Sequence, residues 1–205
     1  WRNDGDPFAG EWTTHPTIGN LPAFVTAVAV GDVDRNGTLE IVVGVDGNSS
    51  VSPTIKIWRF EGDPFVATSW ISSEVAVVSY TVNSIALGDL NNDGWLDIIF
   101  GTSHAPPADP MPEVYQLRAA RNDGAPFNGG WTLFDLGRDP QWTGLEPSHG
   151  YRGETVHSVN LADFDNDGYL DIYAQNGSLE DYDRILLNNG DGTFTDATLD
   201  MFAED

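Results

Sequence analysis

The chain has 205 residues, of which 40% are hydrophobic and 11% aromatic, so it can bury a sizeable core, which argues against a purely disordered chain. Its 32 Asp and Glu against 9 Lys and Arg give a formal net charge of −23, which argues against binding to the phosphate backbone of nucleic acids. Cysteine is absent, which excludes disulfides and a thiolate nucleophile, and no apolar run approaches the roughly 18 residues of a membrane-spanning helix.

The chain opens with a predicted turn and strand. Residues 3–8 contain the Asp, Gly and Pro residues that are typical of turns, and residues 8–14 then predict a strand. A complete unit follows over residues 24–77. Its four strands are predicted at residues 25–30, at 41–44, at 54–58 and, after a turn at 61–65, around Trp70.

Two further units repeat this order over residues 81–137 and 155–202. Their first three strands are predicted at residues 82–87, 98–101 and 114–117, and at residues 156–161, 172–174 and 184–187. Turns at residues 122–127 and 189–194 then lead into a fourth strand, which includes Trp131 in the second unit. Sequence periods of this size are typical of propellers and solenoids.

The predicted fold class is therefore all-β, with blades of four antiparallel strands as in a β-propeller. Residues 1–17 fit the same template one step earlier, as the last strand of a preceding blade. Propellers close with about four to eight blades, so three complete blades and one extra strand do not close a ring. Because an open end would expose strand edges, we expect the remainder of a larger propeller or other copies of the chain to complete the assembly.

An acidic nonapeptide stands between the first and second strands of each unit. Calcium takes about six to eight oxygens, which side chains at positions 1, 3, 5 and 9 and the carbonyl of position 7 can supply when glycine at position 6 permits a sharp bend. The predicted ligands are Asp32, Asp34, Asn36, Thr38 and Glu40 in the first loop, Asp89, Asn91, Asp93, Trp95 and Asp97 in the second, and Asp163, Asp165, Asp167, Tyr169 and Asp171 in the third. We therefore expect about three bound Ca²⁺ ions.

Two other interpretations of these loops are weaker. An EF-hand would place a bidentate acid at position 12, where this chain has Val43, Phe100 and Ala174, and the flanking residues predict strands and not helices. Simple hairpin turns rich in Asp, Asn and Gly would account for one such segment, but three aligned copies favour metal binding.

The three loops, each followed by a hydrophobic run, resemble the FG-GAP and VCBS repeats of calcium-binding β-propellers, the group that includes the integrin α-subunit head. Residues 186–194, Leu-Leu-Asn-Asn-Gly-Asp-Gly-Thr-Phe, are similar to a VCBS hairpin, and the resemblance covers nearly the whole chain. It implies Ca²⁺ between the first and second strands of each blade, in a propeller that serves adhesion, ligand recognition or scaffolding. Segments of variable length after the second strand depart from the integrin pattern, so the blade-to-blade surface is not the integrin one.

A ligand is expected on the face opposite the calcium loops, where the longest irregular segments lie. The candidate residues on this face are His104, Trp142, His149, Tyr151 and Arg152. Trp and Tyr beside polar groups can stack on a sugar ring or anchor a protein partner. Alternatively, Trp142 covers the apolar edge between two blades and His104 is a solvated loop residue.

The function hypothesis is an extracellular or cell-surface calcium-binding module that acts in adhesion, ligand binding or surface assembly. An extracellular location follows if the calcium sites are structural, because moderate sites stay filled only where calcium is abundant. The alternative is the propeller portion of a secreted carbohydrate-active enzyme of the lyase or dehydratase type, in which His104, His149, Tyr151 and Arg152 would converge. A structural subunit of a surface assembly is a third hypothesis. No catalytic residue is assigned from the sequence.

Overall fold

The computed structural model describes residues 2–3, 5–6, 8–10, 12–13, 23–47, 52–103, 116–136, 155–176 and 183–198. In these ranges the protein is all-β, apart from a short 3-10 helix at Ala67–Ser69. The described ranges hold no helix with the length and apolar character that a membrane crossing requires.

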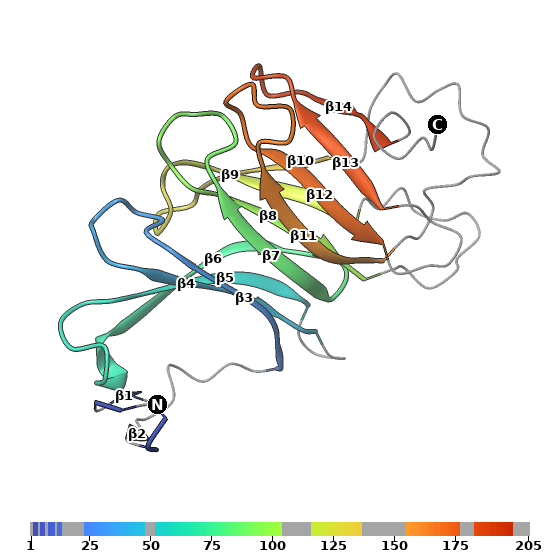
Figure 1. The fold of residues 1–205 in the computed structure, drawn as a ribbon. Helices are drawn as coiled ribbons and strands as arrows, with labels where there is room; N and C mark the ends of the chain where they lie inside the picture. Colours follow the sequence, from blue (N-terminus) through green and yellow to red (C-terminus); the bar gives the residue numbers. More distant parts are fainter. Residues whose placement is uncertain are drawn as a thin grey trace.

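Within the described ranges three sheets have four strands each, and each of them is an antiparallel meander in chain order (Figure 1). Sheet I contains β3 (Val25–Gly31), β4 (Glu40–Val45), β5 (Thr54–Phe60) and β6 (Trp70–Val77). Sheet II contains β7 (Val82–Gly88), β8 (Asp97–Thr102), β9 (Leu117–Ala125) and β10 (Gly130–Asp135). Sheet III contains β11 (Val156–Ala162), β12 (Asp171–Asn176), β13 (Arg184–Asn188) and β14 (Phe194–Asp196).

The expected units of four antiparallel strands are confirmed, whereas their identity as blades of a β-propeller is not. Among the described residues the three sheets do not close on themselves, so the architecture is stated as three successive four-stranded sheets. A fourth, two-stranded sheet pairs β1 (Arg2–Asn3) with β2 (Trp12–Thr13) at the start of the chain.

Two segments differ most from the sequence-based expectation. In sheet II the third strand was expected at residues 114–117, of which the structure describes 116 and 117, and β9 begins only at Leu117. Strand β9 continues through Asn122 to Ala125, where a turn was expected. Asn122 is fully buried there, its N–H is bonded to Asp97, and its side-chain amide is bonded to the carbonyl of Val33 in the first acidic loop. At the start of the chain, the strand begins at Trp12 and not at Phe8. Residues 8–10 form a turn instead, since Asp6 Oδ1 accepts the backbone N–H of Phe8 and Gly10 has a φ of 81°.

Successive sheets pack through their first strands, with β7 beside both β3 and β11. Glycines in one sheet receive leucine and valine side chains of the next. A Cβ built on Gly31 would lie 2.9 Å from Cδ1 of Leu87, and one built on Gly44 would lie 2.7 Å from Cβ of Val82. Gly88 and Gly101 receive Leu161 and Val156 in the same way.

Two apolar cores fill these junctions. Val42, Ile55 and Ile57 of sheet I meet Val82, Ile98 and Phe100 of sheet II in the first core, and all six are fully buried. Ile99, Leu117 and Ala119 of sheet II meet Val159, Ile172 and Ala174 of sheet III in the second. Because β8 contributes Ile98 and Phe100 to one junction and Ile99 to the other, it is buried along its whole length.

Candidate metal centres

The three acidic loops have the same backbone conformation. Position 4 of each loop is a non-glycine residue in the left-handed region, with φ of 58° at Arg35, 55° at Asn92 and 61° at Asn166. Position 6 is glycine at a φ of 86° to 94°, in Gly37, Gly94 and Gly168. A side chain at that position would strain the backbone, so the glycine is required for the bend.

The aspartate at position 1 organises each loop through its own backbone. Asp32 Oδ1 and Oδ2 accept the N–H groups of Asn36 and Gly37, both at 3.0 Å. Asp89 and Asp163 accept the equivalent N–H groups of their loops at 2.7 to 3.0 Å. A carboxylate that accepts two backbone bonds still has lone pairs to offer a cation, since the two oxygens together have about four acceptor sites.

Positions 3 and 5 also turn inward. In the third loop, Asp165 Oδ1 accepts the N–H of Asp167 at 3.1 Å, and Asp167 Oδ1 accepts that of Tyr169 at 2.8 Å. The first and second loops repeat both bonds. The loops are therefore ordered by their own Asp and Asn side chains.

The acid at position 9 is buried in every loop and ties the loop to its sheet. Asp171 Oδ2 accepts the N–H of Phe164 at 2.7 Å, and its Oδ1 accepts the N–H of Asn188 on the third strand at 2.8 Å. Asp97 makes the same two bonds, to Leu90 and Asn122. Position 9 thus has a structural role in addition to the predicted one as a metal ligand.

In two of these acids, Asp97 and Glu40, burial and neighbouring charges disfavour the ionised form. Desolvation raises the pKa of Asp97 to about 6, against the lowering effect of its two backbone bonds, and the charges of Asp93 and Asp89 raise it further. Burial likewise raises the pKa of Glu40, and the charges of Asp34 and Asp32 add to the effect.

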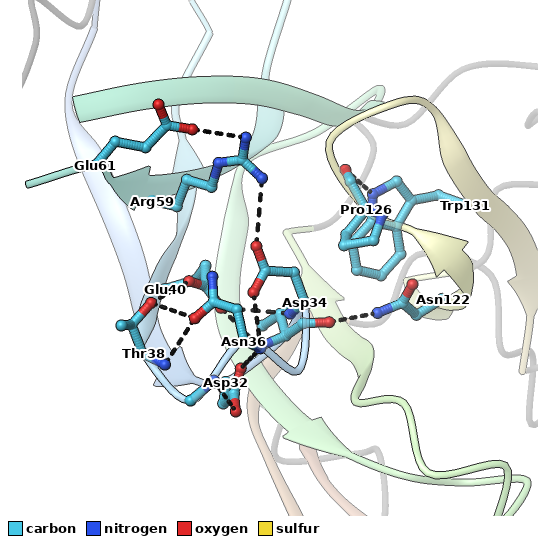
Figure 2. Close-up of polar contacts among 12 residues, drawn as sticks. Asp32, Asp34, Asn36, Thr38, Glu40, Arg59, Glu61, Asn122, Pro126 and Trp131 are labelled. Carbon is cyan, nitrogen blue, oxygen red and sulfur yellow. Dashed lines mark hydrogen bonds and ion pairs between the residues drawn. The ribbon is translucent and has the colours of Figure 1, made fainter. Parts of the chain in front are cut away.

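Two of the loops gather three carboxylates into a group that could hold a metal ion. These groups are Asp32, Asp34 and Glu40 in the first loop, and Asp163, Asp165 and Asp171 in the third. One oxygen from each acid lies within 4.8 Å of the others in its group. Two oxygens bound to one Ca²⁺ are at most about 5 Å apart, so the spacing and the all-oxygen donor set fit this cation. Figure 2 shows the first group, with Asp32, Asp34 and Glu40 turned toward one another.

The second loop differs at position 3, where Asn91 replaces an aspartate. Asn91 Nδ2 donates to Asp93 Oδ2 at 2.8 Å, so an amide occupies one of the oxygens that was expected to bind the ion. This loop therefore offers one carboxylate fewer at position 3 than the other two.

An arginine reaches the first loop from strand β5. Arg59 Nη1 lies 3.4 Å from Asp34 Oδ2, and its Nη2 lies 2.9 Å from Glu61 Oε1 (Figure 2). The guanidinium partly neutralises this loop and would compete with a cation for Asp34. No described arginine or lysine forms an ion pair with the acids of the third loop.

The side chains at position 7 point away from the acids in two loops. The ring of Trp95 lies under the Arg35 guanidinium, 5.2 Å from it, and also beside Gly124 of its own outer hairpin. Tyr169 lies against Gly190 in the same manner. These contacts place the acidic loops and the outer hairpins on one face, as the strand order predicts.

Sequence analysis missed the two asparagines that join neighbouring sheets. Asn122 Nδ2 donates to the carbonyl of Val33 in the first acidic loop at 2.9 Å (Figure 2). Asn188 Nδ2 donates to the carbonyl of Leu90 in the second loop at 2.7 Å. The signal was present as an Asn that ends an apolar strand in both units, but it resembled the start of a turn.

The predicted ligand-face residues His104, Trp142, His149, Tyr151 and Arg152 all lie outside the described residues. The expected ligand face therefore stays a prediction. A scan against protein-family models and a search of the curated proteins both found no match to this chain.

Proposed function

We propose that the chain is a calcium-binding repeat protein in which Ca²⁺ at the acidic loops makes the first hairpin of each sheet rigid. One observation carries the proposal: the carboxylates of Asp163, Asp165 and Asp171 converge within 4.8 Å in a loop whose backbone is already ordered. The first loop repeats this arrangement with a glutamate at position 9.

A bound ion would neutralise the carboxylates that the fold places together. Asp163 and Asp165 would hold it from the loop, and Asp171 would connect it to the third strand through the N–H of Asn188. Because these acids repel one another without a counter-ion, filling the site stabilises the folded protein relative to the unfolded chain. The ion therefore acts as a cross-link between the hairpin and the rest of the sheet.

The wider role that we propose is that of an extracellular β-propeller module of the FG-GAP or VCBS type, which works by binding in adhesion, ligand recognition or surface assembly. Three successive meanders with an acidic loop between the first and second strands support this proposal. The net charge of −23 suits a cation-rich setting outside the cell. Three filled loops would offset roughly six of these charges.

Calorimetric titration of metal-free protein with CaCl₂ tests the calcium sites. We expect saturable binding, strongest at the third loop, and a rise in melting temperature, since ligand at about 100 times its dissociation constant adds about 2.7 kcal/mol of stability. Tyr169 and Trp95 lie at position 7 of two loops, so they should sensitise terbium luminescence there.

Asp165→Asn should remove the tightest site, whereas Asp191→Asn is the matched control. Asp191 is an exposed acid in an outer hairpin, and its Oδ1 accepts backbone and hydroxyl bonds that asparagine can still accept. If calcium neither binds nor changes the melting temperature, the proposal is wrong. Equal losses in both variants would also contradict it.

A further inference from the structure

The hairpin at the start of the chain repeats the outer hairpin of sheet II. Residues 2–13 match residues 121–132 at nine of twelve positions, which are Arg, Asn, Asp, Gly, Pro, Phe, Gly, Trp and Thr in that order. The strand register matches as well, because Asn3 pairs with Trp12 just as Asn122 pairs with Trp131. Strands β1 and β2 thus correspond to the two outer strands of a four-stranded sheet.

A cation–π contact places this hairpin next to sheet I. The Arg2 guanidinium lies 5.5 Å from the ring centroid of Phe65, in the outer hairpin of sheet I. The equivalent Arg59 of sheet I lies 4.4 Å from the centroid of Phe127, in the outer hairpin of sheet II. The β1–β2 hairpin therefore contacts the outer hairpin of sheet I in the way that sheet I contacts the outer hairpin of sheet II.

The side of sheet I that faces the β1–β2 hairpin is apolar and exposed at strand β3 and at the end of the first acidic loop. Val28, Val30 and Leu39 are 60%, 56% and 58% exposed. By strand register they correspond to Ile85, Leu87 and Leu96 of sheet II and to Val159, Leu161 and Leu170 of sheet III. In those sheets the same positions pack against the preceding sheet, with Leu87 and Leu96 close to Gly31 and Leu161 and Leu170 close to Gly88.

We propose that this surface is a docking site for a polypeptide hairpin of the same repeat type, which adds two inner strands to β1–β2 and covers Val28, Val30 and Leu39. Each complete sheet has four strands, whereas the sheet of β1 has two in the described ranges. The added pair would complete a four-stranded sheet and bury the exposed face. The inference rests on sheet packing and does not depend on metal binding.

The interior junctions define the chemistry of the partner. It should be a strand, an acidic loop and a second strand, with glycines where sheet II has Gly88 and Gly101, because a Cβ at either position would collide with the next sheet. Its second strand should begin with an acid, as β8 begins with Asp97, whose carboxylate accepts the N–H of Asn122. Asn3 occupies that asparagine position in β1.

A second copy of the chain fits this site less well. The outward side of sheet III has Ala162 and Gln175 at the two glycine positions and Asn160 where sheet II has Ala86. Gln175 and Asn160 are both exposed. This side is therefore more polar than the sides that sheets I and II use in the two interior junctions.

The test uses the 205-residue chain and a labelled synthetic peptide of residues 82–102, the hairpin that fills the equivalent place in sheet II. We expect saturable binding by fluorescence anisotropy when calcium is present. Binding in calcium supports the proposal whether or not the peptide also binds in EDTA. Amides of residues 2–13 and of β3 should gain protection from hydrogen exchange. The matched control peptide carries Gly101→Val, which keeps strand propensity but adds a side chain where the packing allows none.

Val28→Asp with Val30→Asp in the chain should weaken peptide binding about 100-fold, since burying each valine contributes about 1.5 kcal/mol or more. Both side chains are exposed, so the folded structure should tolerate the change. Leu133→Asp, on the outer strand of sheet II, is the control and should leave binding unchanged. The proposal is wrong if the peptide does not bind in either condition, if the Gly101→Val peptide binds equally well, or if the chain without peptide buries Val28 and Val30 in a dimer.

Discussion

Removing the Asn122 side chain is the sharpest test of how the sheets are joined. Asn122 is fully buried, and its Nδ2 donates to Val33 O at 2.9 Å and to Leu96 O at 3.3 Å. Its Oδ1 accepts the N–H of Gly124 at 3.1 Å. Alanine would leave these three backbone groups without their partner. At about 1 to 3 kcal/mol for each buried group left unsatisfied, with part of the cost relieved by water, we expect a loss of about 3 kcal/mol.

Urea unfolding of Asn122→Ala in calcium would measure this loss as a shift of the midpoint at constant m value. Asn160→Ala is the control, because Asn160 is exposed and bonds only Ser158 among the described side chains, so its change should stay within about 0.5 kcal/mol. Hydrogen exchange should show early opening between sheets I and II in Asn122→Ala. A loss below about 0.5 kcal/mol would refute the view that this amide holds the junction.

Three further outcomes follow from the geometry. In metal-free protein the native Asp97, with a pKa of about 6, holds its proton to higher pH than the unfolded chain, so the free energy of unfolding should fall by about 2 kcal/mol from pH 4 to pH 6, and Asp97→Asn should flatten that slope in urea titrations. Gly101→Ala should cost about 1 to 3 kcal/mol in the same assay, because its Cβ would lie 2.8 Å from Cβ of Val156, and an unchanged midpoint would contradict the tight packing. Arg59→Gln should raise the calcium affinity of the first loop up to about fivefold by freeing Asp34, whereas an equal or lower affinity in calorimetry would contradict competition at that acid.

The sequence predicted the meanders well because the relevant signals are local. β-branched runs on either side of a glycine-containing acidic loop specify a hairpin, and three copies reinforce one another. The errors arose where a tertiary contact overrides local preference. Asn122 resembles a turn residue on its own, but Asp97 and Val33 satisfy it inside a strand. Neither partner is near it in the sequence.

The sequence predicted where the acidic loops lie, but not the contacts that distinguish one loop from another. Spacing alone placed Asp or Asn at positions 1, 3 and 5 and an acid at position 9, and the structure brings three carboxylates together in two of the three loops. The spacing did not indicate that Arg59, on a strand 25 residues further along the chain, bonds to Asp34. Nor did it show that position 9 bonds the backbone of the third strand, since that bond depends on how β12 and β13 pair.

The side chains of Asn122 and Asn188 link the three acidic loops to one another in chain order. Asn122 touches the backbone of the first loop with its amide and the Asp97 carboxylate of the second with its N–H, and Asn188 links the second loop to the third in the same way. The asparagine side chain thus connects neighbouring loops, alongside the contact of Arg35 in the first loop with the Trp95 ring in the second. We expect an array built in this manner to open as a series of coupled elements, so the middle loop, which has a neighbour on both sides, should respond to a change at either one.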